Sequence, residues 1–335
     1  MPLSFRKLRA FWRSPPATKY PSLPKALSAW GPDARHQRPA VLLRWLVTEW
    51  CNYRCPYCPQ THDRRAEKGD GLTAHAFDNF PLETWLEAFD RHFKDYRLSL
   101  VITGGEPMVD RKNMPLLLDH FSAKESVECI RIDTNAWWKP EQFALKDISK
   151  IILMCTFHPS QTSEDEFMAR IRRILDAGFR IGMINYVMHG ADKDLFEDRR
   201  RRFRDIGVAL HPNPLWGSNG TYPEADLAIM KSSLPEVDYL YRTGTQNPYG
   251  KGCLFPALSY EMDYKGHIHA GCMSEGGLFF DSELPKRPLE AVLCPMHSCV
   301  CLDKYSFLSG IERNISTNPL MEYKKALWDR HPERD

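Results

Sequence analysis

The chain of 335 residues is long enough for one large domain with an appendage or for two modest domains. Its 43% hydrophobic and 26% charged residues are typical of a globular protein, and its formal charge of +2 gives no general field that would attract nucleic acid or an acidic membrane. The sequence contains no apolar run of about 18 residues or more, which argues against a transmembrane helix.

The N-terminal segment is basic. Residues 1–20 contain five basic and no acidic residues, and they lack the apolar stretch of a secretory signal. We expect residues 1–40 to form an arm packed on the domain surface. A segment that contacts a membrane or a partner is the alternative.

The ten cysteines are strongly clustered. Three lie within eight residues near the N-terminus, five lie between Cys253 and Cys301, and only Cys129 and Cys155 stand apart. A secreted disulfide protein would spread its cysteines through loops and carry a signal peptide. The clustering therefore indicates metal ligation in a reducing compartment, and we expect a cytoplasmic protein.

From about residue 41 to residue 215, short apolar runs alternate with longer amphipathic ones. The expected strands are 41–48, 98–103, 129–133, 151–157, 180–187 and 208–211. The expected helices are 82–93, 114–120, 140–145, 164–177 and 192–204. Such alternation predicts right-handed βαβ units and a parallel sheet. Six units are too few for an eight-fold barrel, so we predict an α/β fold with a partial, TIM-like barrel over residues 41–216.

The pattern changes after the barrel. Residues 217–252 predict a connector with one short helix near 225–232. Two short apolar pieces at 258–263 and 267–270 flank Gly266, which predicts a hairpin within a small cysteine-rich domain over 253–310. Residues 311–335 are expected to form a helical tail.

The first cysteine group directly follows the first expected strand, in the sequence Cys51-Asn-Tyr-Arg-Cys55-Pro-Tyr-Cys58. Three thiolates at this spacing can wrap one side of a cubane cluster and leave a fourth iron open to a chelating small molecule. A structural zinc site with His62 as the fourth ligand is the alternative.

The Cys-x-x-x-Cys-aromatic-x-Cys pattern, with Tyr57 at the aromatic position, resembles the signature of the radical S-adenosylmethionine superfamily. The resemblance covers roughly residues 41–215. It implies that Cys51, Cys55 and Cys58 hold a [4Fe–4S] cluster whose unique iron is chelated by S-adenosylmethionine. Reductive cleavage then gives a 5′-deoxyadenosyl radical that abstracts a hydrogen atom from the substrate.

Further motifs at the strand ends support this resemblance. The second strand ends in a Gly-Gly-Glu-Pro sequence like the one that contacts the methionine amino group in the family, and the third ends in Thr-Asn, with Ala136 where the family often has glycine. Polar residues of the fourth and fifth strands fall where the family binds ribose and carboxylate. Taken singly, each is equally well explained as a strand-end cap or turn. The predicted cofactor-binding residues are Tyr57, Gly104, Gly105, Glu106, Pro107, Thr134, Asn135, Thr156, His158 and Asn185.

The second cysteine group resembles the SPASM or twitch domains of that superfamily in their shorter, single-cluster form. The resemblance implies that four of its five cysteines bind an auxiliary [4Fe–4S] cluster. A structural zinc knot is the alternative. The candidate ligands are Cys253, Cys272, Cys294, Cys299 and Cys301.

The resemblance implies an enzyme of the oxidoreductase or epimerase type, with a flavodoxin- or ferredoxin-type electron donor and without nucleic-acid or membrane partners. Only the 40-residue arm precedes the first strand, fewer than the roughly 80 residues of a leader-binding domain. We therefore expect a small metabolite (sugar, aminoglycoside or nucleoside-like), epimerised or oxidised, with peptide epimerisation or crosslinking as the second hypothesis. A non-catalytic protein with zinc-stapled cysteines is the rival of another class.

Two lone features have two interpretations each. Cys155, at the end of the fourth strand, is a candidate hydrogen donor to a substrate radical, although a buried apolar role is favoured. Trp137 and Trp138 follow the third strand and suggest a pocket lining, although aromatic packing is favoured.

Overall fold

The computed structural model describes residues 40–58, 60, 73–189, 194–215, 222–234, 239, 243, 247, 249, 252–253, 255–272, 275–288, 292–294 and 297. Six strands in this part of the chain run parallel in chain order. They are β1 (Ala40–Thr48), β2 (Arg97–Gly104), β3 (Val127–Thr134), β4 (Ile151–Phe157), β5 (Arg180–Val187) and β6 (Leu210–Asn213). The predicted partial, TIM-like parallel barrel is therefore confirmed.

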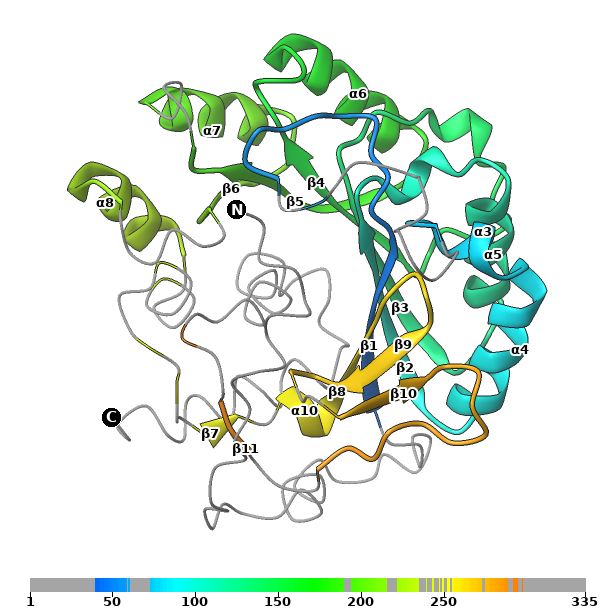
Figure 1. The fold of residues 1–335 in the computed structure, drawn as a ribbon. Helices are drawn as coiled ribbons and strands as arrows, with labels where there is room; N and C mark the ends of the chain where they lie inside the picture. The colour runs from blue at the N-terminus through cyan, green and yellow to red at the C-terminus, as the bar shows by residue number, and fades with distance from the viewer. Residues whose placement is uncertain are drawn as a thin grey trace, which may run out of the picture.

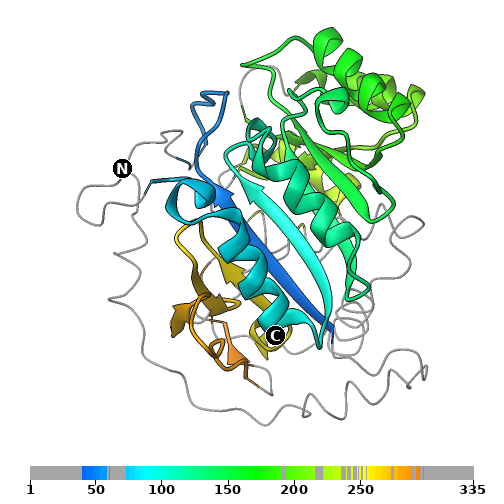
Figure 2. The same ribbon diagram turned by 90° about the vertical axis from the view of Figure 1, so that its right-hand side faces the viewer.

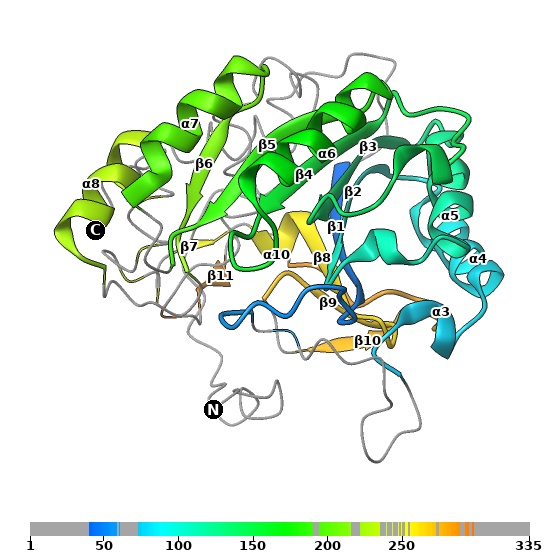
Figure 3. The same cartoon turned by 90° about the horizontal axis from the view of Figure 1, so that it is seen from above.

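Helices cover the outer face of this curved sheet (Figures 1 and 3). They are α3 (Ala76–Asn79), α4 (Leu82–Phe93), α5 (Asn113–Ser122), α6 (Glu164–Asp176) and α7 (Phe196–Asp205). The start of α6 forms a capping box, because the Ser163 side chain accepts from the Glu166 amide and the Glu166 carboxylate accepts from the Ser163 amide. Gly178, at φ 86°, ends that helical segment as glycine readily can.

One predicted helix is wrong. Residues 140–145 form a single 3-10 turn, η3 (Pro140–Gln142), instead of a helix. Phe143 leaves the helical region at φ −119° and packs at 5.1 Å between ring centroids against the buried Trp138. Tertiary packing of an aromatic side chain thus outweighs the local helical pattern. The expected connector helix is present as α8 (Glu224–Ser233).

The predicted hairpin is present and extends the barrel sheet. Strands β8 (Ser259–Met262) and β9 (His267–Ala270) pair antiparallel around Gly266, which has φ 80°, and β10 (Gly276–Leu278) pairs with β9. β8 pairs in parallel with β1, so the sheet order is β10-β9-β8-β1-β2-β3-β4-β5-β6. Figure 2 shows these yellow and orange strands beside the blue β1.

A short second ladder joins β7 (Gly252–Cys253) to β11 (Val292–Leu293), and α10 (Phe255–Leu258) leads from β7 into β8. The residues before Ala40, with the predicted arm, and the predicted tail at 311–335 lie outside the described residues. No helix in the described part of the chain has the length and apolar composition needed to cross a lipid bilayer.

Besides the pairing of β8 with β1, an aromatic side chain that follows β10 packs on the barrel. Phe279 is fully buried, and its ring centroid lies 4.8 Å from that of Phe89 and 6.0 Å from that of Trp85, both on α4. Its neighbour Leu278 is 43% exposed.

Replacing Phe279 by alanine should therefore lower the free energy of unfolding of the barrel by about 3–5 kcal/mol, because a buried aromatic contact is lost and a cavity remains. Leu278→Ala is the matched control and should cost less than about 0.5 kcal/mol. Denaturant titration of both variants measures the difference. An unchanged barrel transition in the Phe279 variant would mean that the hairpin folds independently of the barrel.

Candidate functional site

The cysteine loop begins directly after β1. Cys51 and Cys55 are each 7% exposed and Cys58 is partly buried, and the three pack with Tyr53 and Tyr57 in one small cluster. Burial, together with the neighbouring thiols, raises the pKa of Cys51 to about 11 and that of Cys55 to about 12. The backbone N–H of Tyr53 points at Cys51 Sγ at 3.3 Å.

These thiols fit a [4Fe–4S] cluster. Buried thiols that keep their protons at neutral pH become thiolates when iron binds, and an N–H directed at sulfur is a usual outer contact of such clusters. In the described residues, no three His, Cys, Asp or Glu side chains form a site for a single metal ion. The zinc alternative needed His62, which lies outside the described residues.

The Gly-Gly turn after β2 packs against this loop. A Cβ on Gly104 would lie 2.2 Å from the Thr48 carbonyl oxygen, and one on Gly105 would lie 2.2 Å from the Trp50 carbonyl oxygen. The Gly105 amide donates to Thr48 at 2.7 Å. The glycines thus allow the turn to approach the chain's own backbone, whereas the sequence suggested close approach of a ligand.

The Glu106 carboxylate is the central polar group of the site. It is 1% exposed and accepts hydrogen bonds from the Thr134 hydroxyl at 2.8 Å, the Asn135 amide at 2.5 Å and the Met108 amide at 3.0 Å. Burial raises its pKa to about 7 in spite of these donors. A carboxylate has about four acceptor positions, so one remains for an N–H donor of a ligand.

Asn135 connects Glu106 to the cysteine loop. Its side-chain amide donates to Asn52 Oδ1 at 2.9 Å and lies 3.8 Å from Cys51 Sγ. The next residue, Ala136, has φ 58°, the left-handed conformation that glycine adopts at little cost. The family glycine expected there is thus replaced by a strained alanine.

The opposite side of the loop is held by β4 and α6. The Tyr57 hydroxyl is hydrogen-bonded to His158 Nδ1 at 2.8 Å, and Arg170 donates to the Tyr53 hydroxyl at 2.7 Å. Gln161 accepts from the Arg54 amide at 2.9 Å. Sequence reasoning found Tyr57 and His158 but missed the other contacts, which join residues more than one hundred positions apart.

Of the remaining predicted residues, Pro107 lies in the turn after β2, and Thr156 and Asn185 lie in the sheet. Pro107 is buried at the start of η2 (Pro107–Val109). Thr156 and Asn185 are paired neighbours on β4 and β5, and Asn185 is paired with His211 of β6, which sequence reasoning missed. Because side chains alternate along a strand, these three lie on the face opposite the helices.

Cys155 lies beside Thr134 of β3. It is fully buried in the core cluster on the same face of β4 as Phe157, which packs against Phe167 of α6 at 5.0 Å. Strand alternation therefore directs Thr156, and not Cys155, into the barrel. Because Cys155 is paired with Thr134, whose hydroxyl donates to Glu106, a role for Cys155 as hydrogen donor stays a prediction.

The backbone brings Cys253 close to Cys294, and the residue before Cys272 close to Pro256. In the β7–β11 ladder, Cys253 is paired with Val292, two positions before Cys294. Gly271, next to Cys272, packs so closely on Pro256 that a Cβ would lie 2.7 Å from its Cα atom. Cys299 and Cys301 lie outside the described residues.

Comparisons with known proteins agree with this geometry. A GTP 3′,8-cyclase of Xanthomonas campestris is 32% identical over 221 residues, which are 59% of this chain and 62% of the relative. One from Aquifex aeolicus is 25% identical over 188 residues, covering 52% and 56%. The chain thus spans less than two thirds of these curated relatives. No family model matches the chain.

Solved structures show the same fold. Streptococcus suis SuiB bound to S-adenosylmethionine has a TM-score of 0.52 at 14% identity, covering 77% of this chain and 67% of SuiB. The protein anSMEcpe with bound AdoMet has a TM-score of 0.51 at 12% identity, covering 72% and 75%. The chain thus shares the fold of these two proteins, whose structures hold S-adenosylmethionine. Its cysteine loop and Gly-Gly-Glu-Pro turn lie at the carboxyl ends of β1 and β2, where ligand sites of parallel α/β sheets form.

The contact between the turn and the loop can be tested with one methyl group. Gly105→Ala should lower the free energy of unfolding by about 1–3 kcal/mol, because the new Cβ overlaps the Trp50 carbonyl. Gly277→Ala is the control, since its nearest neighbour would be an ordinary 3.5 Å away. Equal stability of the two variants in denaturant would contradict the packing described here.

Proposed function

We propose that the chain is a radical S-adenosylmethionine enzyme acting on a small polar metabolite. The observation that carries the proposal is the joint placement of the Cys51, Cys55 and Cys58 thiols with the Glu106–Asn135 network at one end of a partial barrel. When bound, a [4Fe–4S] cluster supplies the electron that splits S-adenosylmethionine into methionine and a 5′-deoxyadenosyl radical. That electron comes from a flavodoxin- or ferredoxin-type donor, and the protein acts in the cytoplasm.

The residues of this chain bind and orient the cosubstrate. Glu106 is proposed to accept a hydrogen bond from its amino group, and Thr156 and Asn185 to hold its ribose and carboxylate. Tyr57 and His158, hydrogen-bonded to each other, keep the far side of the loop in place. Enclosure of the site in the barrel limits side reactions of a carbon radical with water.

Charged pairs on the inner face of the barrel support a polar substrate. Arg131 is 3% exposed and bonds to Asp133 at 2.7 Å, and Arg44 bonds to Glu261 at 3.0 Å. These groups face away from the helices, on the same side as Asn185 and His211. The names of the curated relatives specify a nucleotide, which supports a nucleoside-like substrate, epimerised or oxidised. Peptide modification is the second candidate, supported by the SuiB structure with its precursor peptide.

We also propose an auxiliary [4Fe–4S] cluster bound by four of Cys253, Cys272, Cys294, Cys299 and Cys301. The β7–β11 ladder supports it, since it brings the backbone of Cys253 close to Cys294. The contact of Gly271 with Pro256 also supports it, since Gly271 precedes Cys272 and Pro256 lies three residues beyond Cys253.

Alanine variants of the three loop cysteines test the radical chemistry. Each variant should fold but should not release 5′-deoxyadenosine from S-adenosylmethionine under anaerobic, reducing conditions, because the cluster loses a ligand. Cys129→Ala, outside both groups, should keep the activity. Undiminished release by the triple variant, quantified by chromatography, would remove the proposed function.

Glu106→Gln should weaken binding of S-adenosylmethionine by about 1.5–3 kcal/mol, the scale of a hydrogen bond to a charged group. Wild-type affinity should also fall as the pH drops through about 7, where the carboxylate gains a proton, and the variant should lack this dependence. Calorimetric titration measures both effects. Glu128→Gln, at the opposite end of β3 beside Arg97, is the control. An unchanged dissociation constant in Glu106→Gln would make the turn purely structural.

Elemental analysis tests the second cluster. The anaerobically reconstituted protein should contain about eight irons per chain, four for each cluster. Cys272→Ala or Cys294→Ala should reduce this toward four and leave the N-terminal cluster intact. Four irons and one zinc in the unaltered protein would instead make the second group a structural zinc site.

A further inference from the structure

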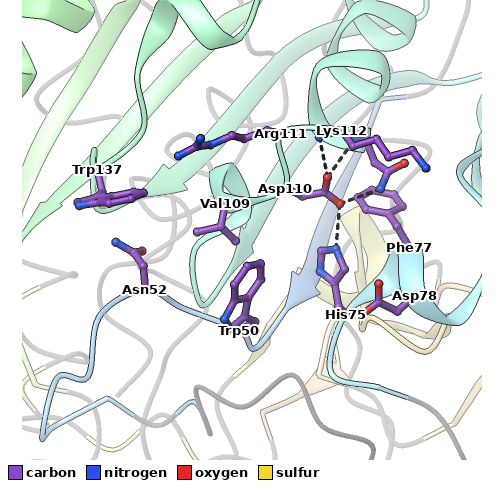
Figure 4. A pocket seen from close by; sticks show the side chains of 11 residues that line it. Trp50, Asn52, His75, Phe77, Asp78, Val109, Asp110, Arg111, Lys112 and Trp137 are labelled. Carbon is purple, nitrogen blue, oxygen red and sulfur yellow. Dashed lines mark hydrogen bonds and ion pairs between the residues drawn. The ribbon is translucent and has the colours of Figure 1, made fainter.

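A solvent-open cleft of about 710 Å³ lies against the outside of the cysteine loop (Figure 4). Three aromatic side chains, Trp50, Phe77 and Trp137, contribute to its lining, and Trp137 is 44% exposed. Arg111 and Lys112 line it beside the start of α5. Its lining includes none of the residues proposed to bind the cosubstrate, but Asn52 and Trp137 of the lining are hydrogen-bonded to Asn135 of that set.

The cleft is directly connected to a proposed cluster ligand. Trp50 and Asn52, the residues on either side of Cys51, both line it. Asn52 accepts from the Asn135 amide at 2.9 Å, and that amide lies 3.8 Å from Cys51 Sγ. A group seated in the cleft is thus separated from the Cys51 sulfur by one layer of contacting side chains.

The floor of the cleft is preorganised by a buried pair. His75 is 1% exposed, and its Nε2 is hydrogen-bonded to Asp110 at 2.9 Å. Asp110 also accepts from the amides of Lys112 and Asn113, which fixes the turn that carries the two cations. The other nitrogen of His75, Nδ1, is buried without a hydrogen-bond partner among the described residues, so the floor retains one polar atom for an incoming group.

The cations of the rim are available to a partner. Arg111 and Lys112 are exposed, and no ion pair within the described residues engages their side chains. Asp78, on the other side of the cleft, is the exposed acidic residue of the lining. An exposed aromatic ring such as Trp137 together with arginine is a common composition of protein interfaces, and two adjacent cations favour an acidic partner.

We propose that this cleft is the docking site of a small, acidic electron-carrier protein with a flavin prosthetic group. The inference rests on the proposed function, which requires one electron at the N-terminal cluster. The flavin hydroquinone anion gives up that electron and becomes the neutral semiquinone, and the cluster is reduced by one unit without transfer of a proton. The aromatic lining favours the planar edge of a flavin, and Arg111 and Lys112 attract the acidic surface around it.

Binding of oxidised flavodoxin to the reconstituted protein tests the docking site directly. Arg111→Glu with Lys112→Glu should raise the dissociation constant at least about tenfold at low ionic strength, and the difference should shrink in about 0.5 M salt. Acidic residues are favourable near the start of a helix, so this variant should fold. Arg172→Glu with Arg173→Glu, an equal charge reversal on exposed positions of α6, is the matched control and should bind like wild type.

Cluster reduction, followed by loss of visible absorbance, provides the second readout. The cleft variant should be reduced more slowly than wild type by flavodoxin hydroquinone but equally fast by dithionite, which needs no docking site. Trp137→Ala should also weaken flavodoxin binding, without any change of charge. Equal affinities of wild type, cleft variant and control, or no binding to wild type, would overturn the docking site. Failure of dithionite to support cleavage of S-adenosylmethionine would instead refute the proposed function.

Discussion

The site depends on one buried carboxylate. Glu106 accepts from Thr134 and Asn135 at the end of β3, and its own amide donates to the Trp50 carbonyl in the cysteine loop at 2.9 Å. Three neighbouring strand ends are therefore held at one point. Because a buried charge is costly unless it is fully hydrogen-bonded, the positions of these donors are strongly constrained. The cysteine loop takes its place from this network.

Burial and hydrogen bonding have opposite effects on the charge of this carboxylate. Burial raises its pKa to about 7, so the ionised carboxylate is less stable here than it would be in water. A donor with positive charge would offset that cost. On the other side of the loop, Arg170 and His158 are hydrogen-bonded to Tyr53 and Tyr57. The thiols therefore lie between these two tyrosines and the Glu106 network. Such preorganisation places the loop before any ligand arrives.

The sequence was sufficient for features with local signals. Alternating apolar runs predicted the six parallel strands, the spacing of Cys51, Cys55 and Cys58 predicted one cluster of thiols, and the amphipathic pattern at 164–177 predicted α6. Features that depend on contacts between residues far apart in the chain could not be predicted from the sequence. The pairing of β8 with β1 joins residues more than 200 positions apart, and the His75–Asp110 pair has no motif.

Electron paramagnetic resonance of the anaerobically reconstituted, dithionite-reduced protein tests the central claim most directly. The account predicts the signal of a reduced [4Fe–4S] cluster whose g-values shift when S-adenosylmethionine is added, since the cosubstrate would chelate an open iron next to Cys51, Cys55 and Cys58. The shift should be absent when these three cysteines are replaced by alanine. A spectrum of the unaltered protein that S-adenosylmethionine leaves unchanged, or the absence of any iron–sulfur signal, would contradict the account.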